Sequence, residues 1–182
     1  MSVFGLKLTY AVGNNEGPDV LRELAMGFEQ GADELRDFGK HVFPRLVPAF
    51  EAAMTRQFNS RGGGQTGAWE TLSAAYAAWK QAHYPGKPLL ERTGALRAAL
   101  TESGTPHSYR EWTARDFSFG TAGLEYASFH QFGTGKMPAR PPFDFDGRFN
   151  SEVEEAALDG VRAAIRATRL GDLGVEVEGG PH

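Results

Sequence analysis

Histidines are the residues of this sequence best suited to acid–base or metal chemistry, and there are five: His41, His83, His107, His130 and His182. They show no close metal-ligand spacing, and the sequence contains neither a His-Glu-x-x-His run nor a Gly-x-Ser-x-Gly elbow. The absence of cysteine excludes disulfides and thiolate metal sites. We therefore expect no metal site and no cofactor.

His130 is the histidine that we single out, because Glu125 and Gln131 stand near it in the sequence. A histidine with a nearby carboxylate can serve as a general base, which leaves a small hydrolase or nuclease as an alternative function. A histidine at an interface or at a helix cap is more common than a catalytic histidine that no motif indicates. We therefore expect no catalytic residue and keep the hydrolase or nuclease as the alternative.

Two short segments resemble ligand-binding loops incompletely. Gly62 and Gly67 stand as far apart as the glycines of a P-loop, but the lysine and hydroxyl residue required next are missing. Residues 144–147 (DFDG) resemble the opening of a calcium loop without its later ligands and closing glutamate. We interpret residues 59–67 as a flexible loop and residues 144–147 as a turn.

Basic side chains in the second half of the chain suggest a second alternative, an adaptor that contacts DNA. Its candidate residues are Arg110, Arg115, Arg140 and Arg148. Acidic residues are interleaved with them, and the net charge of −4 supplies no general attraction for phosphates. Salt bridges between subunits are therefore the favoured role of these arginines.

The elements that would position these residues are short strands and amphipathic helices. Alternation predicts a strand over residues 3–12 and a hairpin of residues 109–113 and 116–119, turning at 114–115 and pairing with the first strand. An apolar stripe predicts a long helix over residues 32–58, bent or broken by Pro44 and Pro48. We expect shorter helices over residues 19–28, 72–83 (Ser73 near its start), 93–100 (capped by Thr93), 124–132 (ending at Gly133) and 151–169.

These elements predict one α+β domain over residues 1–170, with a small antiparallel sheet packed against a long kinked helix and several shorter helices. Hydrophobic residues make up 41% of the 182 residues and charged residues 23%, as in globular domains. Residues 171–182 form a C-terminal tail or an edge strand. No stretch approaches the roughly 18 apolar residues of a membrane span, so we expect no membrane contact.

Short motifs follow one another between Phe58 and Phe143. The first ones are Phe58 before a glycine-containing loop, Trp69 with Leu72-Ser73, Lys80, and Lys87-Pro88-Leu89-Leu90 leading into Arg92-Thr93-Gly94-Ala95-Leu96-Arg97. Downstream come residues 119–121 (FGT), 126–127 (YA), 130–133 (HQFG) and 137–143 (MPARPPF). In order and spacing, this series resembles the phage virion morphogenesis (tail completion) family of tailed bacteriophages.

The resemblance implies a structural virion protein without catalytic activity, acting in tail completion or head-to-tail joining. It implies a homo-oligomer, a hexameric ring at the neck or the head-proximal end of the tail. The implied partners are phage neck or connector proteins and tail tube or terminator proteins, with passive contact with DNA in the channel. The implied location is the virion, after assembly in the host cytoplasm, and the DNA-contacting adaptor would act in the neck channel.

We expect the interface with neighbouring subunits between residues 126 and 143. A proline-bound segment over residues 137–145 is cheap to order and suits docking on a neighbour. Aromatic side chains are core residues by default, but those near loops can anchor an interface. The candidate interface residues are Tyr126, His130, Phe132, Arg140 and Phe143.

Overall fold

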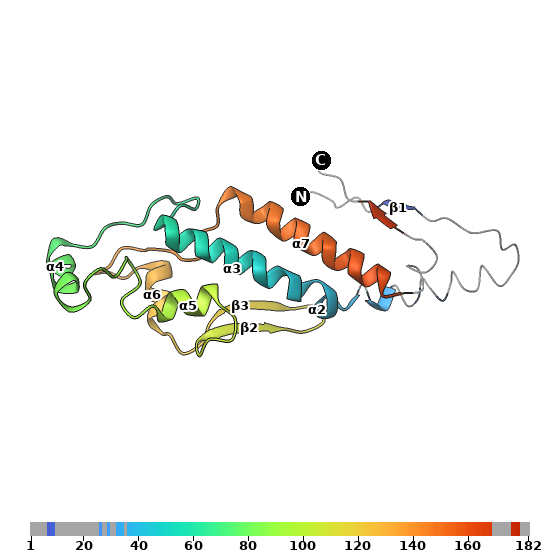
Figure 1. The fold of residues 1–182 in the computed structure, drawn as a ribbon, viewed down its shortest axis with the longest axis horizontal. Coiled ribbons are helices and arrows are strands. Elements are labelled where there is room, and N and C mark those ends of the chain that lie inside the picture. Colours follow the sequence, from blue (N-terminus) through green and yellow to red (C-terminus); the bar gives the residue numbers. More distant parts are fainter. Residues whose placement is uncertain are drawn as a thin grey trace, which may run out of the picture. The chain divides into compact units, whose positions relative to one another are not determined.

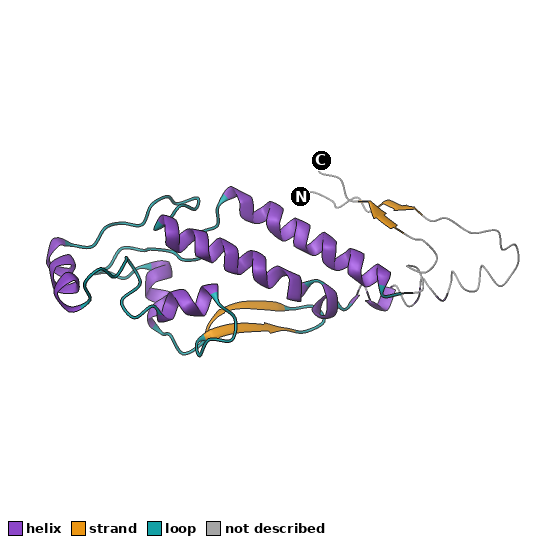
Figure 2. Ribbon diagram, in the orientation of Figure 1, coloured by secondary structure: helices purple, strands orange, loops and turns teal. Residues whose placement is uncertain are grey.

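The computed structural model describes residues 7–9, 26, 29, 32–34, 36–168 and 176–178, and it has an α+β fold, as the sequence predicts (Figure 1). Helices account for most of the regular structure, and the strands form two two-stranded sheets (Figure 2). Within the described residues, no helix is both long and apolar enough to cross a membrane.

The predicted long helix is two helices, α2 (Phe38–His41) and α3 (Phe43–Ser60). Helix α2 ends at Val42, whose amide donates to the carbonyl of Phe38. Pro44 then lies in the first turn of α3, where an amide has no partner within the helix, so a proline fits there. Pro48 lies inside α3, and the helix continues past it to Ser60. The predicted break therefore falls just before Pro44.

Helices α3 and α5 (Ala95–Thr101) enclose a hydrophobic core. Met54 and Phe58 of α3 pack with Leu96 and Leu100 of α5, and all four are buried. Trp69 completes the core, with its ring edge-on to Phe58 at 5.5 Å between centroids. Full burial stabilises each such side chain by roughly 1.5–3 kcal/mol relative to exposure. This core holds together the elements that carry the site described below.

The predicted hairpin is confirmed, but its expected third strand is wrong. Strands β2 (Ser108–Trp112) and β3 (Phe117–Thr121) pair with each other, and Thr113 and Asp116 close the turn through a 2.9 Å backbone hydrogen bond. Strand β1 (Lys7–Thr9) pairs antiparallel with β4 (Glu176–Glu178) instead. The C-terminal segment thus contains an edge strand, whose pairing joins residues too distant for local alternation to specify.

Helices α4 and α5 follow their local signals, and each begins two residues later than predicted. Helix α4 (Ala74–His83) begins after Ser73, whose hydroxyl accepts from the amide of Tyr76. The predicted N-cap of α5, Thr93, is wrong by one position, because Gly94 with φ of +83° occupies the cap. A left-handed backbone at this position favours glycine over threonine.

Two further helices bracket the predicted proline-bound segment. Helix α6 (Tyr126–Phe132) ends at Gly133, whose φ of +72° stops it as predicted. Helix α7 (Gly147–Arg166) begins four residues before the predicted start, because the Asp146 carboxylate accepts from the amide of Phe149 and caps it. The predicted helix over residues 19–28 lies outside the described residues, apart from Met26.

The chain divides into two compact units. One comprises Met1–Leu46, Trp112–Phe117 and Glu154–His182, and the other comprises Val47–Glu111 and Ser118–Val153. The second unit contains the hydrophobic core, α4, α5 and α6. The division cuts through the continuous helices α3 and α7, so the single domain expected over residues 1–170 stays a prediction.

Candidate interaction surface on helix α6

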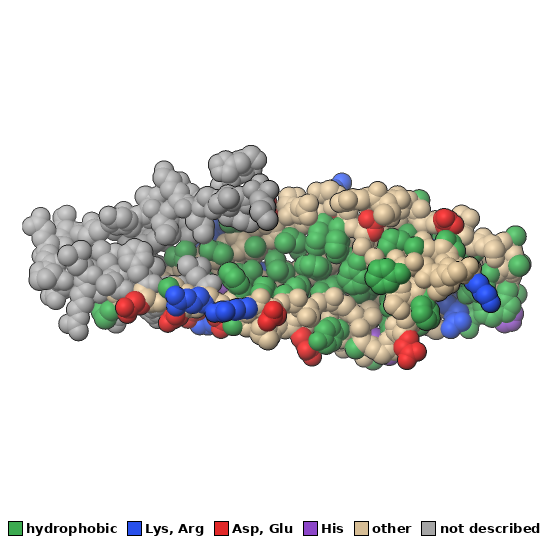
Figure 3. Space-filling model, turned by 180° about the vertical axis from the view of Figure 1, so that it is seen from behind, with side chains coloured by type: hydrophobic (Ala, Val, Ile, Leu, Met, Phe, Trp, Pro, Cys, Tyr) green, Lys and Arg blue, Asp and Glu red, His purple; other side chains and the backbone are tan. Residues whose placement is uncertain are grey.

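Helix α6 presents three aromatic side chains to solvent. Tyr126, Phe129 and Phe132 are 38%, 52% and 80% exposed. They recur every three residues, so they lie on neighbouring positions along one side of the helix. We call these three residues the α6 surface. Exposed hydrophobic side chains of this kind are drawn in green in the space-filling view (Figure 3).

The exposed area of the α6 surface is large for a single seven-residue helix. An aromatic side chain has 150–250 Å² to bury, so these three rings expose on the order of 300 Å² together. Contiguous apolar patches of this size are often functional in soluble proteins. The opposite side of α6 faces inward, because Ala127 packs against the hydrophobic core. The helix is therefore anchored on one side and unpaired on the other.

His130 lies on α6 with its ring largely turned into the protein. Its Nδ1 atom is buried and has no hydrogen-bond partner, and its ring stands edge-on to Tyr126 at 5.9 Å between centroids. Burial, and then the positive charge of Arg140, lower the pKa of the imidazole. Both effects favour the neutral form of the imidazole.

The hydrolase alternative needs a carboxylate that orients this histidine. In the part of the chain that the structure describes, no carboxylate is hydrogen-bonded to His130, and no three His, Asp or Glu side chains converge as metal ligands. The nearby charge is the cation of Arg140, which opposes the imidazolium that a general base must form. The arrangement around His130 thus supports packing better than catalysis.

Arg140 is almost completely buried, at 4% exposure. Its Nε donates to the carbonyl of Glu70 at 2.7 Å, and its Nη2 donates to the carbonyl of Thr71 at 3.0 Å. Its backbone amide donates to the carbonyl of His130 at 2.7 Å. Through its side chain and its backbone amide, this one residue joins the proline-bound segment to the segment before α4 and to helix α6. An interface role for Arg140 stays a prediction. The guanidinium already donates hydrogen bonds to carbonyls of its own chain.

The proline-bound segment lies against its own chain. The carbonyl of Pro141 accepts from Gln57 Nε2 and from Trp69 Nε1, both at 3.1 Å. The amide of Phe143 donates to Gln131 Oε1 at 3.1 Å, and Gln131 Nε2 returns a bond to the carbonyl of Phe143. Phe143 itself is half-buried. Of the five candidate interface residues, Tyr126 and Phe132 are the exposed ones.

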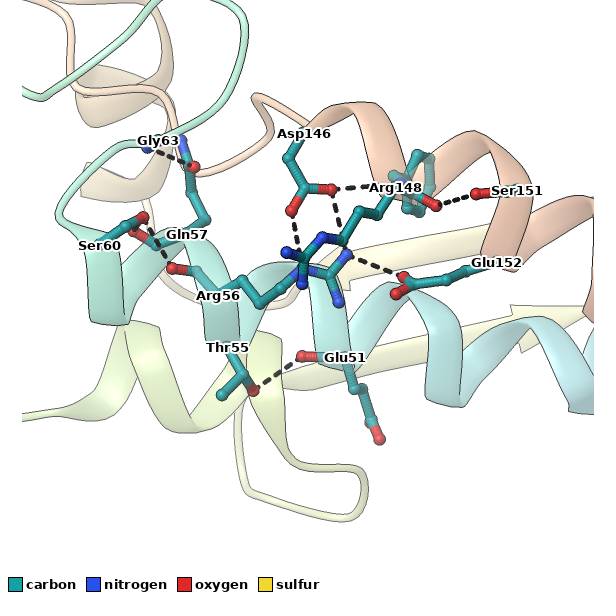
Figure 4. Close-up of polar contacts among 11 residues, drawn as sticks. Glu51, Thr55, Arg56, Gln57, Ser60, Gly63, Asp146, Arg148, Ser151 and Glu152 are labelled. Carbon is teal, nitrogen blue, oxygen red and sulfur yellow. Dashed lines mark hydrogen bonds and ion pairs between the residues drawn. The ribbon is translucent and has the colours of Figure 1, made fainter.

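An ion-pair network that sequence reasoning missed fixes the end of this segment (Figure 4). Arg56 of α3 donates to both carboxylate oxygens of Asp146, at 2.8 and 3.1 Å, and to Glu152 at 2.8 Å. Hydrogen bonding by Arg56 lowers the pKa of Asp146. The partners are 90 and 96 positions apart, so no local pattern could have indicated them.

The glycine-rich segment also has an intramolecular anchor. The Asp144 carboxylate accepts from the amides of Gln65 and Thr66, both at 3.0 Å, and from the Thr66 hydroxyl at 2.5 Å. A Cβ on Gly64 would lie 2.1 Å from the carbonyl oxygen of Asp144, so this position requires glycine. The flexibility of residues 59–67 stays a prediction. Ser60 still belongs to α3, and the Asp144 carboxylate holds the turn through its hydrogen bonds.

The candidate DNA-contacting arginines are not all at the surface. The Arg110 guanidinium is buried, lies 3.6 Å from the Phe119 ring centroid and donates to carbonyls in the last turn of α5. With Arg140 also buried, two of the four guanidiniums cannot reach phosphates in this fold. Arg115 and Arg148 are exposed.

The sequence predicts by default that aromatic side chains lie in the core. This prediction is right for Trp69 and wrong for the two other tryptophans. Trp79 and Trp112 are each 40% exposed. Trp79 lies on α4, whose only buried residue is Lys80. A large side chain alone does not indicate burial, because the tertiary packing decides which side of a short helix is covered.

Comparisons of the chain with protein-family models, with curated proteins and with solved structures find no match.

Proposed function

We propose that this chain is a structural virion protein of a tailed bacteriophage that acts in tail completion or head-to-tail joining. It assembles as a homo-oligomeric, hexameric ring at the neck or the head-proximal end of the tail. There it contacts neck or connector proteins and tail tube or terminator proteins. Its location is the virion, after assembly in the host cytoplasm, and its role requires no catalysis.

The α6 surface is the observation that carries this proposal. Phe132 is 80% exposed at the end of a helix that the rest of the unit holds firmly. Transfer of such a ring from water to a protein interface is favourable, at roughly 25 cal/mol per Å² of apolar surface. Rigid, exposed aromatic residues are typical anchors of protein–protein contacts. A subunit that must bind its neighbours needs a surface of this kind.

The motif residues support the proposal in a second way, because the fold uses them together. Leu96 is in the hydrophobic core, Gly133 ends α6 and Arg140 joins three segments. The motifs that resemble the tail completion family are therefore residues that build one unit. Their order along the chain therefore has a structural reason.

The α6 surface can be tested by changing Phe132→Asp. Light scattering coupled to gel filtration should show a ring of about six subunits for the wild type at high concentration and a monomer for the variant. The monomer should remain folded, because substitutions of exposed residues usually change the free energy of unfolding by less than about 0.5 kcal/mol. Circular dichroism and thermal unfolding check this.

Ser128→Asp is the matched control, since it adds the same charge to another exposed position of α6. It should assemble like the wild type. The proposal is contradicted if Phe132→Asp assembles normally. It is also contradicted if the wild type stays monomeric at every concentration, alone and with phage neck and tail proteins.

A further inference from the structure

A second aromatic surface lies on helix α4, where it has no role in the function proposed above. Tyr76 and Trp79 are 43% and 40% exposed, and their rings stack at 5.5 Å between centroids. The ring of His83 also stacks on Trp79, at 4.6 Å between centroids. We call these three residues the α4 surface. It is a continuous row of rings along a short helix.

The polarity of α4 is the reverse of that of an ordinary surface helix. All of its residues except Ala77 and Lys80 are exposed, and most of them are alanine or aromatic. Its lysine is buried instead, with Nζ bonded to the carbonyl of Pro88. A helix exposed on nearly every side is normally polar. The apolar exterior of α4 therefore indicates a helix that is covered when the protein is assembled.

The charges around α4 indicate which kind of surface covers it. Residues 71–90 contain no aspartate or glutamate, although the whole chain has a net charge of −4. Lys87 is exposed at the end of this segment, and Arg92 lies over the Tyr84 ring at 5.6 Å. A complementary partner is apolar at its centre and acidic at its margin.

The α6 surface is apolar at its centre and has an acidic residue at its N-terminal margin. Its three rings follow Glu125, which is exposed, and within the described residues neither Glu125 nor Lys87 belongs to an ion pair. Pairing either surface with its own copy would add a second Lys87 or a second Glu125 to the contact, so these two residues would supply no pair of opposite charges. Pairing α4 with α6 brings opposite charges together at the margin of an apolar contact.

We propose that the α4 surface of one copy docks on the α6 surface of a second copy. This inference rests on the proposed function and names the contact that builds the oligomer. The contact joins two different surfaces, so a pair of copies still has one free α4 surface and one free α6 surface. Further copies add head to tail, and the chain of contacts closes as a ring where the rotation between neighbours allows it. The aromatic rings form its centre. A stable interface buries roughly 800 Å² per partner. The alanines of α4, which allow a close approach of another helix, and the polar margins add to the area that the rings bury.

A mixing experiment tests which surfaces meet. Trp79→Glu removes the α4 surface and Phe132→Asp removes the α6 surface, so each variant alone should be a monomer. An equal mixture should form a complex of twice the monomer mass, because the intact α4 of one variant can dock on the intact α6 of the other. This complex cannot grow. Sedimentation velocity at the concentration where the wild type is assembled measures these masses.

Gln81→Glu is the control for Trp79→Glu, since it places the same charge at an exposed position on α4 outside the row of rings, and it should assemble normally. Circular dichroism shows whether each variant is folded. A Trp79→Glu variant that assembles like the wild type overturns the inference, and a monomeric Phe132→Asp in the same experiment leaves the proposed function intact. A mixture that stays monomeric also overturns it. A wild type that never assembles overturns both.

Discussion

The backbone amide of Arg140 donates a 2.7 Å hydrogen bond to the carbonyl of His130, while the guanidinium of the same residue holds the carbonyls of Glu70 and Thr71. This contact ties the proline-bound segment to the last turns of α6. It keeps the helix in place although the aromatic side chains on its outer side contribute little to folding. The exposed surface is therefore presented on a rigid support, which lowers the entropic cost of binding.

Replacing Arg140 should destabilise the fold without changing its surface. Arg140→Lys keeps the charge but cannot reproduce the fork that reaches two carbonyls, so the free energy of unfolding should fall by about 1–3 kcal/mol. Urea denaturation measures this. Arg115→Lys, at an exposed position, should change it by less than about 0.5 kcal/mol. Equal effects of the two substitutions would show that the guanidinium of Arg140 is dispensable.

His130 should make stability fall in mildly acidic solution. Its pKa is lowered in the folded state from the ordinary 6.5, so the unfolded chain binds the proton more tightly. This contribution to stability is fully present above about pH 6.5 and is lost as the pH falls from there toward the folded pKa. His130→Gln should flatten the loss between pH 7 and 5, as measured by urea denaturation at several pH values. An unchanged slope in His130→Gln would refute the assignment.

Arg56→Met should weaken the network around the start of α7. The Asp146 pKa is lowered by the Arg56 hydrogen bonds, so the corresponding stability is present above the ordinary value of 3.8 and lost as the pH falls below it. At pH 7 the variant should lose about 1 kcal/mol, a modest figure because these side chains are partly exposed to solvent.

Below pH 4 the Arg56→Met variant should approach the stability of the wild type. Thermal unfolding across this pH range measures the difference. Arg36→Met is the control, because the Arg36–Asp33 pair is mostly exposed and should contribute almost nothing. A constant difference between Arg56→Met and the wild type from pH 7 to pH 2 would contradict this account.

Asp144→Ala should loosen the glycine-rich turn. The amides of Gln65 and Thr66 lose their acceptor, so their hydrogen exchange should become at least about tenfold faster, which corresponds to about 1.4 kcal/mol of local stability. The amide of Trp69, which donates to the carbonyl of Arg61, serves as the internal reference. Asp159→Ala, far along α7, should change neither rate. Fast exchange at 65 and 66 in the wild type would instead show that this turn opens readily, as the sequence predicts.

Local patterns in the sequence determined much of the helical structure. Ser73 before α4 and Gly133 after α6 specify their helix ends because a cap acts within three or four residues. The alternation on both sides of residues 114–115 likewise specified a hairpin, since a tight turn joins neighbouring segments. The apolar stripe of α3 identified Met54 and Phe58 as core residues. In the candidate site, these patterns located α6 and its aromatic residues.

Only the tertiary structure decided which side chains are covered. Arg140 is buried and Trp79 is exposed, against what their residue types suggest, because burial depends on segments that arrive from elsewhere in the chain. The same holds for the Arg56–Asp146 pair and for the pairing of β1 with β4, whose partners are far apart in the sequence. Local periodicity carries no information about such distances. The exposed sides of α4 and α6 therefore became visible as two different surfaces only in the folded chain.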